Sequence, residues 1–320
     1  MSISSQKSRS LIMCATPLQM LIAEKIIELN KEKEFDLLVL APSNNDKYYY
    51  YYQKLKTLCL DSLYYVDTKS SITSFLSYIG ELKRGDLDKR YQNLYLANID
   101  FRHFHYLISR NSKSSIYTFD DGIANVIPNN IYSSSIRLSI WKRTISYLIG
   151  INTCTANVKK LSLLHYTLYK DVPNIVSPTE YISLYNNKCE ENITNKKVFK
   201  FYLGQPMTEV NDSYCSDYIH KTLEKLDIDF YFPHPRENYD ITKVKVINSQ
   251  LIFEEYIINF LNKNTDSRVE IYSFISTASL NLTNINTIKS FYICDKFLSE
   301  NYKDFYNLAS EKFNINIIRV

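Results

Sequence analysis

Two adjacent carboxylates, Asp120 and Asp121, follow an apolar run at residues 115–119 and precede Gly122. Neighbouring carboxylates repel each other, so the pKa of one of them rises and that group becomes a better proton acceptor near neutral pH. Gly122 permits a tight turn at this point. The pattern predicts a general base at the end of a strand, and the alternative is an ordinary turn, in which Asp-Gly is common.

A histidine lies between two prolines in the segment Pro233-His234-Pro235, which follows an expected strand at residues 229–232. The prolines restrict the backbone on both sides and hold the imidazole at a defined angle, which suits a hydrogen-bond donor or a general acid. Stiffened loops also carry histidines that have only a structural role. No second histidine lies nearby in the sequence, so a metal site is the weakest interpretation of this motif.

Ser276 and Thr277 lie where an expected strand at residues 269–274 passes into an expected short helix at residues 276–282. Hydroxyl groups and free backbone N–H groups at a helix N-terminus form an anion site of the right size for one phosphate. The alternative is a plain N-cap made by Ser276, which needs no ligand.

Other residues at element ends could contact a nucleotide. Gly204 and Gln205 follow an expected strand at residues 198–203, and a small residue at a strand end lets the backbone approach a ligand. Glu254 and Glu255 open an expected helix. They could cap that helix or accept hydrogen bonds from ribose hydroxyls.

These motifs belong to an alternating pattern of short apolar runs and longer amphipathic stretches, which predicts parallel sheets with helices on both faces. In the first half we expect strands at residues 11–15, 35–41, 62–66, 93–97 and 115–119, and helices at residues 18–29, 46–58, 72–82, 101–109 and 136–148. In the second half we expect strands at residues 198–203, 229–232, 243–247, 269–274, 288–294 and 315–318, and helices at residues 214–226, 251–261, 276–282 and 296–311.

Polar clusters between residues 151 and 197 predict loops and a domain connection, with a boundary near residue 195. The fold class is therefore α/β, with two Rossmann-like domains, 1–195 and 196–320, that face a cleft. Ligands of such sheets bind outside the carboxyl ends of the strands. Most of the motifs above lie at such ends.

Composition excludes several function classes. The 320 residues carry a net charge of +4, and the 38 Lys and Arg are spread along the chain, so the basic stripe of a nucleic-acid binder is missing. With five glycines there is no GxGxxG motif, and the residues after Gly85 do not complete a phosphate-binding P-loop. The six cysteines are isolated and form no CxxC pair, so we expect no metal site.

The order of the motifs resembles that of bacterial sialyltransferases, and of glycosyltransferase family 52 in particular, which includes lipooligosaccharide and capsule sialyltransferases. The resemblance covers about residues 11–315. The segments that carry it are Ala15-Thr16-Pro17-Leu18-Gln19-Met20 with Ala23-Glu24, the Asp120-Asp121-Gly122 turn, Leu203-Gly204-Gln205-Pro206, the His234-Pro235 strand end, Glu254, and the Ser276-Thr277 pair.

The resemblance implies a glycosyltransferase B fold, with an acceptor-side domain at residues 1–195 and a nucleotide-sugar domain at residues 196–320. Asp121 would be the base, or else Asp212, an acidic residue before the His-Pro element. His234 would be the acid or the partner of the phosphate. The residues expected to bind the donor nucleotide are Gly204, Gln205, Pro235, Glu254 for the ribose, and Ser276 and Thr277 for the phosphate.

The implied activity is an inverting transfer of N-acetylneuraminic acid from CMP-sialic acid to a terminal galactose, in α-2,3 linkage, on a bacterial capsule or lipooligosaccharide glycan. CMP carries one phosphate, so neither a magnesium clamp nor another cofactor is required. The alternatives are another sugar transferase, such as a glucosyltransferase, and a non-catalytic sugar-nucleotide-binding subunit of capsule assembly. We expect a cytoplasmic protein that could form a homodimer and could contact the inner face of the membrane, with Lys83-Arg84 and Lys142-Arg143 as candidate contacts.

Overall fold

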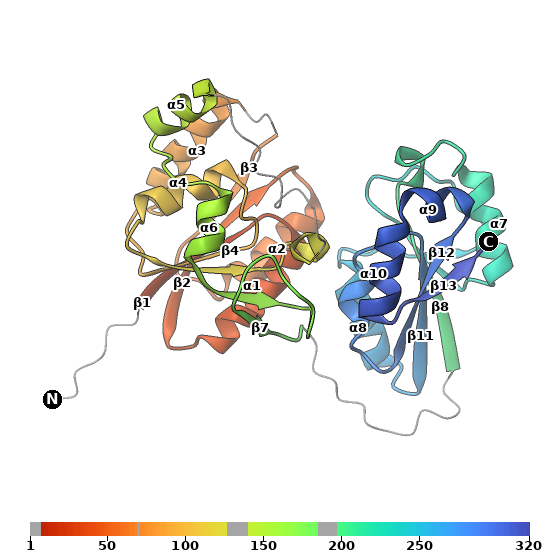
Figure 1. Ribbon diagram of the computed structural model, residues 1–320. Coiled ribbons are helices and arrows are strands. Elements are labelled where there is room, and N and C mark those ends of the chain that lie inside the picture. Colours follow the sequence, from red (N-terminus) through yellow and green to blue (C-terminus); the bar gives the residue numbers. More distant parts are fainter. Residues whose placement is uncertain (1–7, 69–70, 127–139, 185–196) are drawn as a thin grey trace. The chain divides into compact units, whose positions relative to one another are not determined.

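The computed structural model describes residues 8–68, 71–126, 140–184 and 197–320 (Figure 1). The chain divides into two compact units, Met1–Leu184 and Tyr185–Val320. Each unit is built around one parallel sheet flanked by helices, as the alternating sequence pattern predicts. The predicted domain boundary near residue 195 lies outside the described residues.

The sheet of the first unit has seven strands, all paired in parallel, in the order β3-β2-β1-β4-β5-β6-β7. Its elements along the chain are β1 (Ser8–Cys14), α1 (Pro17–Leu29), β2 (Lys33–Ala41), α2 (Asp46–Lys56), β3 (Ser62–Val66), α3 (Ile72–Arg84), β4 (Asn93–Leu96), α4 (Arg102–Arg110), β5 (Ser115–Phe119), the 3₁₀ turn η1 (Gly122–Asn125), α5 (Ile140–Leu148), α6 (Thr155–Leu161), β6 (Ser162–Thr167) and β7 (Thr179–Tyr181).

The turn from β1 into α1 illustrates how the sequence forms these elements. The last five residues of β1 are buried, as a central strand requires when helices cover both of its faces. Thr16 then caps α1 in a reciprocal capping box with Gln19, and Pro17 occupies the first helical position, where a missing N–H costs nothing. The strand therefore ends, and the helix begins, within three residues.

The core on one face of the first sheet joins strands β1, β2 and β4 to helices α3 and α4. Its members are fully or almost fully buried apolar side chains, among them Leu11, Met13, Leu38, Leu40, Leu94, Leu96, Phe75, Tyr78, Leu82, Phe104 and Leu107. Burial of such side chains contributes about 1.5–3 kcal/mol each, so this core fixes the strand ends relative to one another.

The second unit has a six-stranded parallel sheet in the order β10-β9-β8-β11-β12-β13. Its elements are β8 (Lys197–Leu203), η2 (Met207–Glu209), α7 (Ser216–Leu226), β9 (Phe230–Phe232), β10 (Lys245–Val246), α8 (Phe253–Lys263), β11 (Ser267–Ser273), η3 (Leu280–Leu282), β12 (Ile288–Cys294), α9 (Lys296–Asn301), α10 (Lys303–Phe313) and β13 (Asn316–Arg319).

Both sheets reverse their chain order beside their first strand. In the first unit the reversal lies between β1 and β4, and in the second it lies between β8 and β11. Open α/β sheets bind ligands at the carboxyl ends of the strands that flank such a reversal. The residues that follow β1, β4, β8 and β11 are therefore placed to do chemistry.

The structure corrects three predictions about elements. No helix covers residues 276–282, where a turn is followed by the three-residue η3. Side-chain hydrogen bonds replace the helix, because the Ser276 carbonyl accepts from the hydroxyls of Ser279 and Tyr292. The predicted helix at residues 296–311 is divided into α9 and α10 by Tyr302, which has φ −125°. Residues 151–184, for which we predicted no individual helix or strand, contain α6, β6 and β7.

The described helices are short, and the longest, α1 and α3, have 13 residues each. An apolar helix needs about 20 residues to cross a bilayer. None of the helices in the described ranges combines the length and the apolar character that a membrane span requires.

Candidate active site

Asp121 lies at the carboxyl edge of the first sheet, just beyond β5. Two side-chain amides hold its carboxylate: Gln19 Nε2 donates to Oδ1 at 2.5 Å, and Asn98 Nδ2 donates to Oδ2 at 2.9 Å. Gln19 follows β1 and Asn98 follows β4, the two strands at the reversal of chain order. The parallel sheet thus brings three distant segments together around one half-buried carboxylate.

The two amides are oriented by their own backbone neighbours. Gln19 Oε1 accepts the N–H groups of Ala15 and Thr16, at 2.5 and 3.3 Å, and Asn98 Oδ1 accepts the N–H of Asp100 at 2.9 Å. With each amide oxygen occupied in this way, each NH₂ group must face Asp121. The site therefore presents two fixed donors to the carboxylate and holds it in one orientation.

Asp120 has a different environment from its neighbour. It is completely buried and accepts hydrogen bonds from His165 Nε2, Thr167 Oγ1 and the Leu168 N–H at 2.9, 2.9 and 2.7 Å. These contacts tie the end of β5 to the end of β6. The two carboxylates that look equivalent in the sequence thus separate into a structural group, Asp120, and a candidate reactive group, Asp121.

A phenol lies within electrostatic reach of Asp121. Burial, and after it the negative charge of Asp121, raises the pKa of Tyr48 in α2. The Tyr48 hydroxyl therefore stays protonated at neutral pH and can donate a hydrogen bond to a group bound near the carboxylate.

In the second unit Gln205 joins the two strands at the reversal. Gln205 follows β8, and its Oε1 accepts the backbone N–H groups of Phe274 and Ile275, just beyond β11, at 2.9 and 3.0 Å. An acceptor shared by two successive N–H groups fixes the path of the chain after β11. Gln205, predicted to contact the nucleotide, therefore orients the loop that carries Ser276.

Ser276 and Thr277 follow this fixed bend. Ser276 is buried, and its Oγ accepts the Ala278 N–H at 3.3 Å, whereas Thr277 is exposed. Since no α-helix starts here, the predicted helix N-terminus is absent from this part of the structure. A phosphate at this position would have to bind the hydroxyls and the turn rather than a helix end.

His234 lies beyond β9, which pairs with β8. Its Nδ1 accepts the backbone N–H of Arg236 at 3.1 Å. A neutral imidazole with an accepting Nδ1 carries its proton on Nε2. The loop thus presets His234 as a donor through Nε2, while Pro235 is exposed beside it.

Glu237 covers Gly204 at the same edge of the sheet. A Cβ atom on Gly204 would lie 2.6 Å from Glu237 Oε1 and closer still to Oε2, so only glycine fits without displacing the carboxyl group. Burial raises the pKa of Glu237 to about 7, and the neighbouring Tyr231 hydroxyl and His234 backbone offset only part of that rise. Glu237 Oε2 and the hydroxyls of Tyr202 and Tyr231 are buried at this edge of the sheet.

The remaining predicted residues lie on different parts of the second unit. Glu254, in the first turn of α8, is buried and its Oε1 accepts from Asn281 Nδ2 at 2.9 Å, which ties α8 to η3. Asp212 is exposed on the turn between η2 and α7. Glu254 is thus held in place by a partner, whereas the Asp212 carboxylate is open to solvent.

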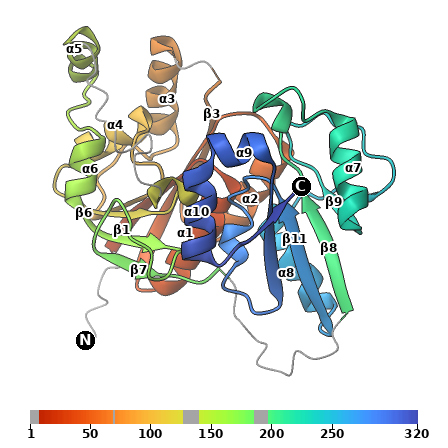
Figure 2. The ribbon, with the colours of Figure 1, turned by 45° about the vertical axis from the view of Figure 1, so that its right-hand side comes forward.

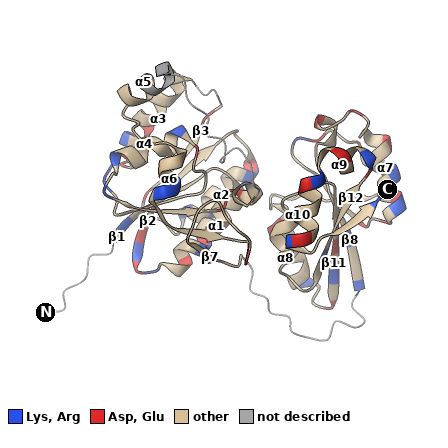
Figure 3. Ribbon diagram, in the orientation of Figure 1, with Lys and Arg blue, Asp and Glu red and all other residues tan. Residues whose placement is uncertain are grey.

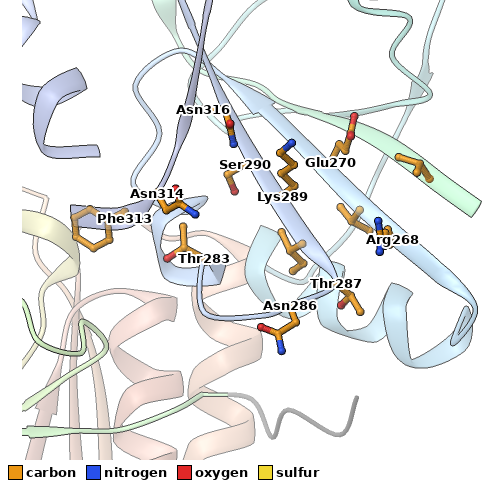
Figure 4. A pocket seen from close by; sticks show the side chains of 13 residues that line it. Arg268, Glu270, Thr283, Asn286, Thr287, Lys289, Ser290, Phe313, Asn314 and Asn316 are labelled. Atoms are coloured by element: carbon orange, nitrogen blue, oxygen red, sulfur yellow. The ribbon is translucent and has the colours of Figure 1, made fainter. Parts of the chain in front are cut away.

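A cavity of about 380 Å³ in the second unit lies away from these residues (Figure 4). Arg268, Glu270 and Lys289 line it from β11 and β12, together with Val198 at the start of β8 and Asn316 at the start of β13. These positions belong to the amino ends of the strands. The cavity is therefore separate from the carboxyl edge, where the candidate active-site residues lie.

The sequence matches the model of glycosyltransferase family 52 over residues 32–296. The chain belongs to this family. It is 32% identical over 278 residues to the N-acetyllactosaminide alpha-2,3-sialyltransferase of Haemophilus influenzae, with 85% of this chain and 88% of that protein aligned. It is 30% identical over 275 residues to the CMP-N-acetylneuraminate:beta-galactoside alpha-2,3-sialyltransferase of Pasteurella multocida, which covers 86% of this chain and 87% of that protein.

Solved structures show that the family 52 chain has the glycosyltransferase B fold. The glycotransferase of kitacinnamycin and TcCGT1 in complex with UDP each match with a TM-score of 0.50, covering 98% of this chain and 86% of theirs. Their sequence identities of 9% and 10% restrict this similarity to the fold. The family and the two Rossmann-like domains predicted from the sequence are thereby confirmed.

Sequence reasoning missed four residues that contact or neighbour the candidate site residues. Asn98 and Tyr48, which lie near Asp121, were not singled out, and Glu237 was given no role. Gln19 was named only as part of the segment at residues 15–20 that carries the family resemblance. Gln19 and Asn98 could have been found, because they follow the strands at the chain reversal. Tyr48 and Glu237 reach their positions through tertiary packing, and no pattern in the neighbouring sequence predicts such packing.

We expect Glu237 to make the stability of the second unit depend on pH. The folded protein keeps this carboxyl protonated up to about pH 7, whereas its ordinary pKa is 4.5. Stability therefore falls as pH rises from about 4.5 to 7 and levels off above that range. Glu237→Gln should remove this loss and stabilise the protein at pH 8, relative to wild type, by about 1–3 kcal/mol.

Urea unfolding of both proteins at pH 5 and pH 8 measures this difference. The matched control is Glu300→Gln on the exposed surface of α9, which should keep the wild-type pH dependence. Parallel pH profiles for wild type and Glu237→Gln would show that the carboxyl titrates normally.

Proposed function

We propose that this family 52 glycosyltransferase moves N-acetylneuraminic acid from CMP-sialic acid to a terminal galactose in α-2,3 linkage, with inversion. The observation that carries the proposal is the 32% identity, over 85% of the chain, to a protein named as an N-acetyllactosaminide alpha-2,3-sialyltransferase. A capsule or lipooligosaccharide glycan of a bacterial surface is the proposed acceptor.

The reaction needs three groups, and the chain supplies a candidate for each. The acceptor hydroxyl oxygen forms a bond to the anomeric carbon, the bond from that carbon to the CMP phosphate breaks, and the hydroxyl proton passes to a carboxylate. In our proposal Asp121 takes this proton, and the neutral His234 donates a hydrogen bond from Nε2 to the phosphate, which departs as the CMP anion with the electron pair of the broken bond. Ser276 and Thr277 bind the charge that develops on that phosphate.

Asp121 is our first choice as base because it is positioned before any substrate binds. Gln19 and Asn98 each donate to one of its oxygens, which keeps the carboxylate in one orientation and still leaves lone pairs for a proton. Asp212 is the alternative, and it lies on an exposed turn. A base must be ready at a defined position, so preorganisation favours Asp121.

The activity is tested with CMP-sialic acid and lactose, with UDP-glucose and UDP-galactose as competing donors. We expect sialyl-lactose with inverted configuration from the first donor and no product from the others. If the protein transfers sugar from a UDP-sugar and not from CMP-sialic acid, it is another sugar transferase with the same fold. Binding of CMP without transfer to any galactoside would indicate a non-catalytic subunit.

We expect Asp121→Asn to lower the turnover number by about 10²–10⁴-fold, the usual contribution of a general base. Affinity for CMP should change little, because the loss falls on the transition state. Steady-state kinetics and calorimetry measure the two effects. Asp212→Asn is the matched variant: if it loses turnover while Asp121→Asn keeps it, then Asp212 is the base and the Asp-Asp-Gly segment is a turn.

We expect Ser276→Ala combined with Thr277→Ala to weaken CMP binding by about 1–3 kcal/mol, the range for hydrogen bonds to a charged group. Calorimetric titration with CMP measures this change. Ser299→Ala, an exposed hydroxyl on α9, is the control and should bind CMP normally. An unchanged dissociation constant in the double variant would remove these hydroxyls from the site.

We expect full activity in excess EDTA. In the described parts of the chain, no group of three or more His, Cys, Asp or Glu side chains is arranged to hold a metal ion. The charge on one departing phosphate can be stabilised by hydrogen bonds from the His234 imidazole N–H and from hydroxyls. Activity that EDTA abolishes and magnesium or manganese restores would contradict the mechanism.

A further inference from the structure

The cavity of about 380 Å³ at the amino ends of the strands of the second sheet has no role in the proposed reaction. We call it the β12-edge pocket. Both views of the ribbon show the amino ends of β8 and β11 at the opposite end of the second unit from α9, which follows the carboxyl end of β12 (Figures 1 and 2). Its volume is near the lower limit for ligand pockets, about 300–1,000 Å³, so it has room for a small molecule.

The β12-edge pocket lies along one edge of β12. Strand β12 pairs with β11 from Ile288 onward, whereas β13 joins its other edge only from Phe291, which lies opposite Asn316. In the described ladders Ile288, Lys289 and Ser290 therefore have a strand partner on the β11 side alone, and all three line the pocket. Since successive side chains of a strand point to opposite faces, the pocket receives groups from both faces of the sheet (Figure 4).

A buried hydroxyl lines the pocket. The Ser290 side chain is 5% exposed, and its Oγ atom makes no hydrogen bond within the described part of the chain. Buried polar groups are almost always paired with protein, water or a ligand, because an unpaired one destabilises the fold. The Ser290 hydroxyl is therefore available to a molecule that enters the pocket.

The charged side chains of the pocket favour an anion. Arg268 and Lys289 supply two positive charges, and Glu270 is the one carboxylate among the lining residues that the structure describes. Glu270 Oε2 already accepts the Tyr272 hydroxyl, at 2.6 Å. Figure 3 shows where the basic and acidic residues of the second unit lie. A carboxylate suits this site, because the planar guanidinium of Arg268 can donate to both of its oxygens.

The rest of the pocket suits a molecule with many hydroxyl groups. Its neutral hydrogen-bonding side chains are Thr283, Asn286, Thr287, Ser290, Asn314 and Asn316. Amides and hydroxyls both donate and accept, as the hydroxyl groups of a sugar do. Among the described lining residues the aromatic one is Phe313, which is 8% exposed, so a nucleobase would find no open ring face on which to stack.

We propose that the β12-edge pocket binds an acidic sugar, whose carboxylate contacts Arg268 and Lys289 and whose hydroxyls pair with Ser290 and the neighbouring amides. This identification rests on the proposed function, because N-acetylneuraminic acid is the acidic sugar that the reaction would transfer. The pocket lies at the amino ends of the strands, away from the carboxyl edge, so it is a second sugar site. Free sialic acid, or the sialylated end of a glycan, would be held there without occupying the transfer site.

NMR titration of the full chain with N-acetylneuraminic acid, 3′-sialyl-lactose and glucose tests the proposal. We expect the acidic sugars to bind, less tightly in high salt, and glucose to bind at least about tenfold more weakly. Tighter binding of sialyl-lactose than of the free sugar would identify the end of a glycan as the ligand, and the reverse order would identify free sialic acid.

Two variants locate the binding. Arg268→Gln combined with Lys289→Gln should raise the dissociation constant of N-acetylneuraminic acid by at least about tenfold, since both cations are lost. Ser290→Ala should raise it about two- to tenfold. The second variant should not lower stability in urea unfolding, because the hydroxyl that it removes has no partner within the described fold.

The matched control is Lys245→Gln on β10, which should bind the acidic sugars like wild type. Lys245 is an exposed lysine whose Nζ lies 5.6 Å from the centroid of the Phe230 ring, just as Lys289 Nζ lies 5.0 Å from that of Phe291. An equal loss of binding in this control would overturn the proposal, because the loss would then reflect net charge alone.

The same proteins separate this proposal from the proposed function. Turnover with CMP-sialic acid and lactose should stay at the wild-type level in the pocket variants, so transfer and pocket binding are measured independently. Absence of sialyl transfer would contradict the proposed function and leave the binding result to decide on the pocket. Wild type that binds neither acidic sugar, binding that persists unchanged in the double variant, or glucose bound as tightly as N-acetylneuraminic acid would overturn the proposal.

Discussion

Parallel strand pairing is the constraint on which the rest of the protein depends. When every strand of a sheet runs in the same direction, all carboxyl ends meet at one edge, and the helices that connect the strands must cover the faces. In both units the chain order reverses beside the first strand, which leaves an opening at that edge. Asp121 in the first unit, and Gln205, Ser276 and His234 in the second, occupy these edges because the topology leaves them no other place.

Side-chain amides then convert an approximate position into a fixed one. Gln19 and Asn98 use their oxygens on their own backbone and their NH₂ groups on Asp121. Gln205 likewise uses its oxygen, which accepts two backbone N–H groups beyond β11. Amides are suited to this task because they carry a donor and an acceptor without a net charge. They orient charged groups without competing electrostatically with the substrate.

The sequence predicts the sheets well because the strands are short apolar runs with clear boundaries. Residues 62–66, 115–119 and 288–294 were predicted with the bounds of β3, β5 and β12. Prediction from the sequence fails where side-chain hydrogen bonds determine the backbone conformation. The hydroxyls of Ser279 and Tyr292 prevent a helix at residues 276–282, and β7 is a short, exposed edge strand with no apolar pattern. Likewise, nothing in the sequence distinguishes the buried Asp120 from the half-buried Asp121, because their difference arises from His165 and Thr167, more than 40 residues away.

The contact between Gly204 and Glu237 makes these two positions dependent on each other. A side chain at position 204 needs the space that the Glu237 carboxyl group occupies, and a smaller residue at position 237 would open that space. The effects of substitutions at the two positions should therefore be strongly non-additive, as expected for residues in direct contact. A side chain can enter position 204 only after the residue at position 237 has become smaller, whereas position 237 can change while Gly204 is kept, so the order of two substitutions decides whether the intermediate sequence is viable.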